Sequence, residues 1–184
     1  MANAFTVIRL ILAVPFALLV ARSDPHSSAW AGLALLVAIA TDLADGPVAR
    51  RTGTVSVLGG TLDHLSDFVF VTAGLAAAAV RGAVPWLLPA LIIAAFAQYC
   101  LDSYFVHGRR ALRGSRLGRY NGILYFVPLG GLVLVGIGLN VLRPVLRLII
   151  WVLVLSTVVS MAQRLTAARR GSASPASRYR RSAY

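Results

Sequence analysis

The stretch DLADGPVARRTGTVSVLGGTLDHLSD, residues 42–67, holds four of the six acidic residues of this 184-residue chain. Apolar runs flank it at residues 29–41 and 68–80. Each run alone is too short to cross a hydrocarbon core of about 30 Å, because a spanning helix needs roughly 20 residues. Each becomes long enough only when the adjoining aspartates are included. The stretch therefore predicts two membrane helices that carry acidic residues within one half of the membrane.

The composition of the whole chain agrees with a membrane protein. Hydrophobic residues make up 58% of it, charged residues only 13%, and the mean hydropathy is +0.77. Soluble domains carry about 25% charged residues. These values exclude a soluble enzyme, a disordered protein and a secreted disulfide scaffold, and the single Cys100 cannot form an intramolecular disulfide.

Turn signals divide the chain into six apolar segments, which predict an all-α integral membrane protein with six transmembrane helices. We expect spans at residues 5–22, 28–50, 57–80, 84–106, 119–139 and 144–164. Residues 1–166 would form one transmembrane domain. Residues 167–184 are rich in Arg, Ser and Ala and predict a disordered basic tail on the cytoplasmic side.

The arginines predict the orientation. All 18 basic residues are Arg, and with six spans 13 of them fall on the side that holds both termini. The opposite side holds Arg22, Arg81, Arg143 and Arg147. The positive-inside rule then places both termini in the cytoplasm of a multi-pass protein of the cell membrane. We attribute the net charge of +12 to orientation and to contact with anionic lipids, not to nucleic acid.

The four clustered aspartates need compensation. An Asp at the bilayer centre costs about 2.5–3.5 kcal/mol on insertion scales, and like-charged carboxylates require protons, arginines or metal cations. At 100° per residue the acids fall on one stripe of each helix, together with small residues. The first stripe contains Asp42, Asp45, Gly46 and Ala49, and the second contains Gly59, Asp63 and Asp67. Facing stripes would form an all-oxygen pocket suited to Mg²⁺, Mn²⁺ or Ca²⁺.

The spacing of these residues resembles a known signature. The pattern Asp-x2-Asp-Gly-x2-Ala-Arg-x8-Gly-x3-Asp-x3-Asp resembles that of the CDP-alcohol phosphotransferases, the membrane enzymes of phospholipid head-group synthesis. Its fixed positions here are Asp42, Asp45, Gly46, Ala49, Arg50, Gly59, Asp63 and Asp67. An N-terminal stretch, Asn3-x2-Thr6-x2-Arg9, also resembles the short Asn/Thr/Arg segment that often opens this family.

The resemblance implies an activity. Such enzymes transfer a phosphatidyl group from CDP-diacylglycerol, or a similar CDP-lipid, to a small alcohol and release CMP, with two divalent ions, Mg²⁺ or Mn²⁺. It implies that Asp42, Asp45 and Asp63 are metal ligands, while Asp67 completes the metal site and acts as general base. It also implies a homodimer of six-helix subunits with the active site open to the cytoplasm. The implied CDP contacts are Gly46, Ala49, Arg50, Gly59, Asn3, Thr6 and Arg9.

The alcohol acceptor is suggested by charge in the loop before the fifth span. Four arginines there could bind a phosphorylated acceptor such as glycerol 3-phosphate or inositol phosphate, or could instead contact anionic lipid. A polar residue inside the fourth span could bind the acceptor's hydroxyls or hold an arginine. These residues are Arg109, Arg110, Arg113, Arg116 and Asp102.

Two other classes use intramembrane acids. A non-enzymatic cation-binding protein or transporter would need polar groups along several spans to the far side, where the only acid here is Asp24. A prenyltransferase-like enzyme would also bind a pyrophosphate through Asp and Mg²⁺. It would be expected to be longer and to carry two well-separated Asp-rich motifs.

Overall fold

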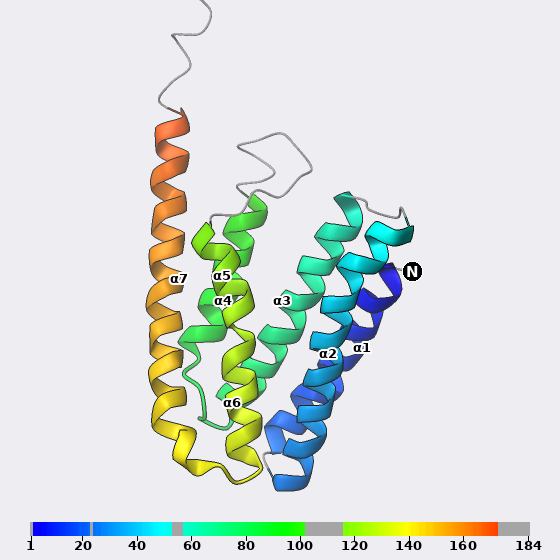
Figure 1. Ribbon diagram of the computed structural model, residues 1–184. Helices are drawn as coiled ribbons and strands as arrows, with labels where there is room; N and C mark the ends of the chain where they lie inside the picture. The colour runs from blue at the N-terminus through cyan, green and yellow to red at the C-terminus, as the bar shows by residue number, and fades with distance from the viewer. Residues whose placement is uncertain (1, 23, 53–56, 102–115, 173–184) are drawn as a thin grey trace, which may run out of the picture.

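The computed structural model describes the backbone of residues 2–22, 24–52, 57–101 and 116–172 (Figure 1). Within these ranges, some residues are described by their backbone alone. They are residues 2–4, 45–52, 57–58, 116–117, 119 and 167–172.

The described chain is helical throughout and contains no strand. In chain order the helices are α1 Ala2–Arg22, α2 Pro25–Thr52, α3 Val57–Val80, α4 Leu87–Leu101, α5 Arg116–Leu124, α6 Phe126–Gly136, the 3₁₀ turn η2 Asn140–Leu142, and α7 Arg143–Ser172. This architecture confirms the all-α fold class.

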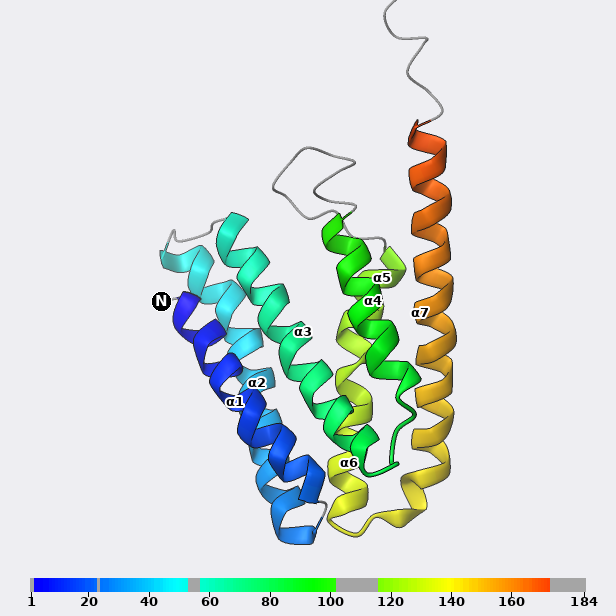
Figure 2. The ribbon, with the colours of Figure 1, turned by 180° about the vertical axis from the view of Figure 1, so that it is seen from behind.

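Two groups of helices pack side by side. Helix α1 packs against α2 and α3, whereas α7 packs against α4, α5 and α6 (Figures 1 and 2). Contacts of α3 with α4 and α6, and of α2 with α6, join the two groups. The end of α1, the beginning of α2 and the short connections at residues 80–87 and 136–143 lie at one end of the bundle, the lower end in Figure 1.

The outer surface is apolar, as expected of a protein surrounded by lipid. Ile11, Leu36 and Leu155 are each about two-thirds exposed (67%, 66% and 66%), although a soluble protein rarely exposes large contiguous apolar patches. Within the described residues, four helical segments are long and apolar enough to cross a membrane: Phe5–Arg22, Pro25–Ala44, Gly59–Val80 and Asn140–Thr166. Two shorter apolar segments, Leu87–Leu101 and Tyr120–Gly136, accompany them. The chain is therefore a helical membrane protein.

The fifth expected span differs from the prediction. We expected one helix over residues 119–139, but the structure has α5 and α6, which are separated at Tyr125. Pro128 explains the interruption, because a proline ring clashes with the carbonyl four residues earlier, here that of Leu124, and Pro cannot donate a backbone hydrogen bond. The expected span boundaries rested on turn signals between spans, whereas this interruption comes from a proline within one.

The last helix continues past the expected domain boundary at residue 166. Helix α7 ends at Ser172, so the first part of the segment expected to be a tail has a helical backbone. Residues 173–184 lie outside the described part of the chain.

A stack of aromatic rings holds α1, α3 and α6 together below the acidic residues. The Phe16 and Phe70 ring centroids are 4.6 Å apart, and those of Phe70 and Phe126 are 6.3 Å apart. Gly74 lies one helical turn beyond Phe70. A Cβ atom there would collide with the Phe16 ring and come within 2.9 Å of Leu129 Cδ2. Glycine at this position therefore permits the close approach of α1 and α3.

Candidate metal and substrate site

Three aspartates from two helices meet at the upper end of the bundle. Asp42 comes from α2, and Asp63 and Asp67 come from successive turns of α3. One carboxylate oxygen from each lies within 4.8 Å of the others. Their side chains are 41%, 25% and 25% exposed, respectively. The structure thus brings together three of the four aspartates that were expected to share a pocket.

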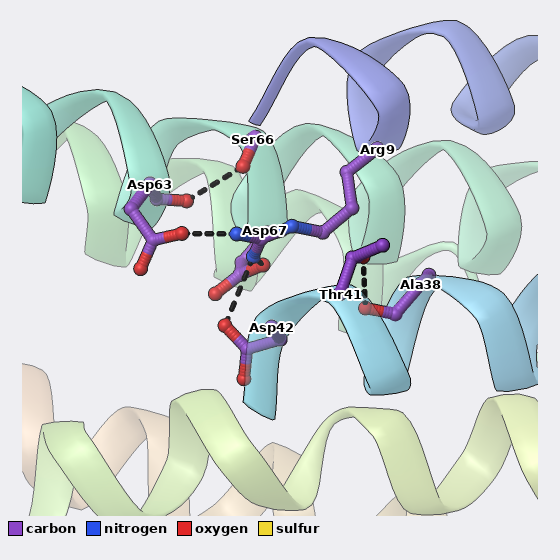
Figure 3. A network of polar contacts seen from close by, with 7 residues as sticks. All are labelled: Arg9, Ala38, Thr41, Asp42, Asp63, Ser66 and Asp67. Atoms are coloured by element: carbon purple, nitrogen blue, oxygen red, sulfur yellow. Dashed lines mark hydrogen bonds and ion pairs between the residues drawn. The ribbon is translucent and has the colours of Figure 1, made fainter. Parts of the chain in front are cut away.

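Arg9 of α1 is the cation at the centre of this cluster. Its side chain is fully buried, and its guanidinium donates hydrogen bonds to all three carboxylates (Figure 3). The distance from Arg9 Nη1 to Asp42 Oδ1 is 3.0 Å, and the same guanidinium is paired with Asp63 and Asp67. Three helices are therefore linked through one side chain. The family resemblance implied that Arg9 contacts CDP, and these ion pairs were not expected from the sequence.

Neighbouring hydroxyls are bonded within their own helices. Thr41 Oγ1 donates to the Ala38 carbonyl oxygen at 2.8 Å, and Ser66 Oγ donates to the Asp63 carbonyl oxygen at 2.8 Å (Figure 3). Such back-bonding leaves these hydroxyls without a proton to donate to the carboxylates. Among the described residues, Arg9 is the partner that the three carboxylates share.

The donor set suits a hard divalent cation. Carboxylate oxygens are the ligands that Mg²⁺, Mn²⁺ and Ca²⁺ prefer, and three acids this close together require positive charge beside them. Asp45 follows on α2, one turn after Asp42, but its side chain lies outside the described residues. The ligand roles stay predictions, while the geometry of the described aspartates is compatible with them.

The other residues expected at the site are described to different extents. Thr6 is buried on α1, one turn before Arg9, and Gly59 is half-buried near the start of α3. The side chains of Asn3 and Arg50 lie outside the described residues, as do details at Gly46 and Ala49.

The residues expected to bind the acceptor cannot be placed in the structure. Asp102, Arg109, Arg110 and Arg113 lie outside the described residues. Arg116 begins α5, where only its backbone is described.

A cavity of about 450 Å³ opens beside the carboxylates. Asp42, Asp63 and Asp67 form part of its wall, and residues of α4, α5 and α7 form most of the remainder. The cavity therefore lies between the two groups of helices. A molecule that occupied it would contact the acidic cluster directly.

Polar side chains that sequence analysis overlooked line this cavity on its α5 and α7 side. Asn121 is 2% exposed and accepts a 2.7 Å hydrogen bond at Oδ1 from Ser156, whereas its buried amide nitrogen finds no acceptor in the described structure. Thr157 donates to the Leu153 carbonyl oxygen at 2.6 Å, so Tyr125 must be the donor in its 2.7 Å bond with Thr157. The signal was present in the sequence, since polar residues within membrane helices are functional candidates by default.

An arginine also lines this cavity, on the side away from the aspartates. The guanidinium carbon of Arg164 lies 5.0 Å from the centroid of the Tyr99 ring, and both residues belong to the wall. Gln98 of α4 donates a 3.2 Å hydrogen bond to the Met161 carbonyl oxygen and so ties α4 to α7 beside Arg164. The cavity thus combines an acidic side with a basic one.

The chain resembles known proteins over much of its length. Two proteins named "Probable phosphatidylglycerophosphate synthase", from the CDC 1551 / Oshkosh and ATCC 25618 / H37Rv strains of Mycobacterium tuberculosis, are each 31% identical to it over 98 residues. The aligned region is 50% of this chain and 46% of each relative, so the match spans about half the length of these relatives. The CDP-alcohol phosphatidyltransferase family model matches residues 1–159, which include the aspartates, Arg9 and the cavity-lining residues of α4 and α5. This helical membrane protein, with its acidic cluster beside an internal cavity, therefore belongs to the CDP-alcohol phosphatidyltransferase family.

Proposed function

We propose that the protein transfers the phosphatidyl group of CDP-diacylglycerol to glycerol 3-phosphate and releases CMP. The acceptor hydroxyl oxygen forms a bond to the lipid-linked phosphorus. The bond from that phosphorus to the bridging oxygen breaks, and the oxygen leaves with CMP. The hydroxyl proton passes to a carboxylate of the acidic cluster. The product is an anionic phospholipid.

The observation that carries this proposal is the joining of the acidic cluster to the cavity. Three carboxylates share one wall with buried polar groups and Arg164. A donor pyrophosphate and an acceptor hydroxyl could both lie within reach of the same carboxylates. Divalent cations held by Asp42, Asp45, Asp63 and Asp67 would neutralise the pyrophosphate and the departing CMP.

The side chains of the cluster divide the remaining tasks. Asp67 faces the cavity and is positioned to receive the proton of the acceptor hydroxyl, which is a poor nucleophile without a base. Arg9 holds the carboxylates together. In the loaded enzyme we expect its guanidinium to bind the pyrophosphate together with Thr6, Asn3, Arg50 and the small residues of the two motif helices.

The choice of acceptor is supported by charge and by the relatives. Arg164 gives the cavity a cation that can bind the phosphate of an acceptor. The Asn121 amide and the Tyr125 hydroxyl offer hydrogen bonds to its carbon-bound hydroxyls. The relatives' name describes an enzyme that forms phosphatidylglycerophosphate, and glycerol 3-phosphate is the alcohol that yields this product.

We also propose that all six apolar segments cross the cell membrane, with both termini and the acidic cluster on the cytoplasmic side. The support is the distribution of the 18 arginines, which favours the end that carries the cluster. In this arrangement the acyl chains of the donor remain in lipid while the water-soluble acceptor enters from the cytoplasm. A homodimer is part of the same proposal.

The test is CMP release from CDP-diacylglycerol by the purified full-length protein with Mg²⁺ or Mn²⁺. The acceptors are glycerol 3-phosphate, inositol phosphate, myo-inositol, serine and glycerol, each alone. We expect metal-dependent CMP release with glycerol 3-phosphate, and phosphatidylglycerophosphate as the lipid product. Release with a different acceptor would refute the acceptor assignment and leave the reaction class intact.

A matched pair of variants separates catalysis from general charge effects. Asp63→Asn removes one carboxylate of the cluster, whereas Asp24→Asn removes an exposed carboxylate at the other end of the bundle. Asp24 accepts a 2.9 Å hydrogen bond from the Ser27 backbone N–H, and hydrogen bonds from Ser27 hold the pKa of this carboxyl below its ordinary value. Asn also caps helices well. We expect activity to be lost only in Asp63→Asn, and equal activities would contradict the proposed site.

A further inference from the structure

A second cavity lies at the end of the bundle opposite the aspartates. It has a volume of about 700 Å³ and lies between the connection from α3 to α4 and the beginning of α7. Three arginines line it, Arg81, Arg143 and Arg147, together with Trp86 and Trp151. No acidic residue belongs to its described wall. This cavity therefore has a strongly positive lining that no residue of the wall compensates.

These arginines lie together at the end of the bundle that holds the smaller share of the chain's arginines. The sequence places four arginines on this side of the membrane, and three of them line the one cavity. The positive-inside rule favours arginine on the other side. Their grouping here therefore needs a local reason.

The backbone fixes Arg81 at the rim without using its side chain. Helix α3 ends in a Schellman motif, in which Gly82 has φ of +74°. The Gly82 N–H donates to the Ala79 carbonyl oxygen at 2.9 Å, and the Ala83 N–H donates to that of Ala78 at 3.0 Å. The carbonyls of Ala78 and Ala79 are thus satisfied by backbone groups and do not need the guanidinium of Arg81 as a cap.

Arg81 is left short of partners. Its Nε atom is buried and makes no hydrogen bond, and none of the three arginines forms an ion pair with a described residue. Burial and the nearby charge of Arg143 lower the pKa of the Arg81 guanidinium. Arg143 Nε is held at 3.0 Å by Asn140 Oδ1, which leaves its terminal nitrogens available. A buried donor without an acceptor is destabilising, and an anion in the cavity would supply the missing acceptor.

We propose that the cavity lined by Arg81, Arg143 and Arg147 binds the phosphate of an anionic phospholipid from the surrounding membrane. Arginine suits this ligand because its planar guanidinium forms paired hydrogen bonds with phosphate oxygens.

The surroundings favour a lipid over free phosphate. Trp86 and Trp151 are 58% and 51% exposed at this end of the bundle, and exposed tryptophans are typical of the lipid headgroup layer. Leu132, Leu146 and Ile150 are buried core residues that complete the cavity wall with apolar side chains. An excess of positive charge selects an anionic headgroup over a zwitterionic one.

The experiment is native mass spectrometry and thermal unfolding of the delipidated full-length protein. Phosphatidylglycerol, phosphatidylcholine and inorganic phosphate are added separately. We expect phosphatidylglycerol to be retained and to raise the melting temperature, and the other two to do neither. An equal response to phosphatidylcholine would overturn the requirement for an anionic headgroup. An equal response to inorganic phosphate would overturn the lipid assignment.

Variants assign the binding to this cavity. Arg81→Gln removes the guanidinium with a buried Nε, and Arg147→Gln alters an exposed side chain whose loss should not affect folding. Arg22→Gln is the matched control, because it removes the same charge from an exposed position at the same end but outside the cavity wall. We expect phosphatidylglycerol binding to weaken about tenfold in the first two variants and to be unchanged in Arg22→Gln. Equal phosphatidylglycerol binding by Arg147→Gln and Arg22→Gln would refute this site. If the lipid bound in the cavity beside the aspartates instead, none of the three substitutions would weaken its binding.

Discussion

The ion pairs of Arg9 predict that the stability of the acidic cluster depends on divalent cations when this arginine is removed. In Arg9→Met, the three carboxylates keep their positions but lose their shared cation, while the apolar stem remains. Removing one partner of a buried ion pair costs about 3–5 kcal/mol. The carboxylates here are 25–41% exposed, and solvent screens their repulsion. We therefore expect a loss nearer 2–3 kcal/mol.

This loss can be measured as a change in melting temperature. For chains of 150–250 residues, 1 kcal/mol corresponds to about 2–4 °C, so Arg9→Met should melt roughly 4–12 °C below the wild type in EDTA. A cation at 100 times its dissociation constant contributes about 2.7 kcal/mol. Saturating Mg²⁺ or Mn²⁺ should therefore recover most of the loss, because the cations take over the role of the guanidinium.

The assay is thermal unfolding of purified protein in one detergent, with EDTA or with Mg²⁺. Arg22→Met is the control, since it changes an exposed arginine at the other end of the same helix. A melting temperature for Arg9→Met equal to that of the wild type in EDTA would refute the structural role of the ion pairs. An equal deficit in EDTA and in Mg²⁺ would refute the cation site.

Three further predictions test the cluster, the cavity and the helix packing. Asp67→Asn should fold and bind CDP-diacylglycerol but release CMP about 10²–10⁴-fold more slowly, the range typical of a lost general base. A wild-type rate of CMP release in a single-turnover assay would exclude Asp67 as the base. Asn121→Leu should raise the KM for the acceptor about tenfold by removing one hydrogen bond, and the KM for CDP-diacylglycerol should not change. A change in the KM for CDP-diacylglycerol alone would show that Asn121 does not bind the acceptor. Gly74→Ala should destabilise the protein by about 1–3 kcal/mol, because its Cβ collides with Phe16. Gly130→Ala is the control, since a Cβ there meets nothing within 4 Å. Equal melting temperatures for the two variants would contradict the described packing at Gly74.

The sequence was sufficient for the features that follow from chain composition and local spacing. The all-helical membrane fold follows from apolar runs of the right length, and helices α1, α2, α3 and α7 lie close to the expected spans. Asp63 and Asp67 share a face because four residues make about one helical turn. A single pattern therefore predicted correctly that these two carboxylates lie together.

Features that depend on how helices rotate against one another were not predictable in this way. Arg9 is separated from its three partners by 33, 54 and 58 residues, and no local spacing indicates which face of α1 meets α3. Close packing at Gly74 determines that rotation. The polar wall around Asn121 and Tyr125 was missed for a similar reason, because the position of a polar residue along the chain does not indicate which neighbours it will face. The interruption at Tyr125 could have been read from Pro128.

The placement of Arg9 on the first helix also bears on how the chain enters the membrane during synthesis. The ribosome completes α1 before α2 and α3, so the arginine is inserted before any aspartate of the cluster. An isolated Arg costs about 2.5–3.5 kcal/mol at the membrane centre, and each aspartate that follows meets a countercharge already present. Because Arg9 precedes the aspartates along the chain, each acidic helix enters the bilayer after its countercharge. An arginine on α7 would instead follow all of the acids of the cluster.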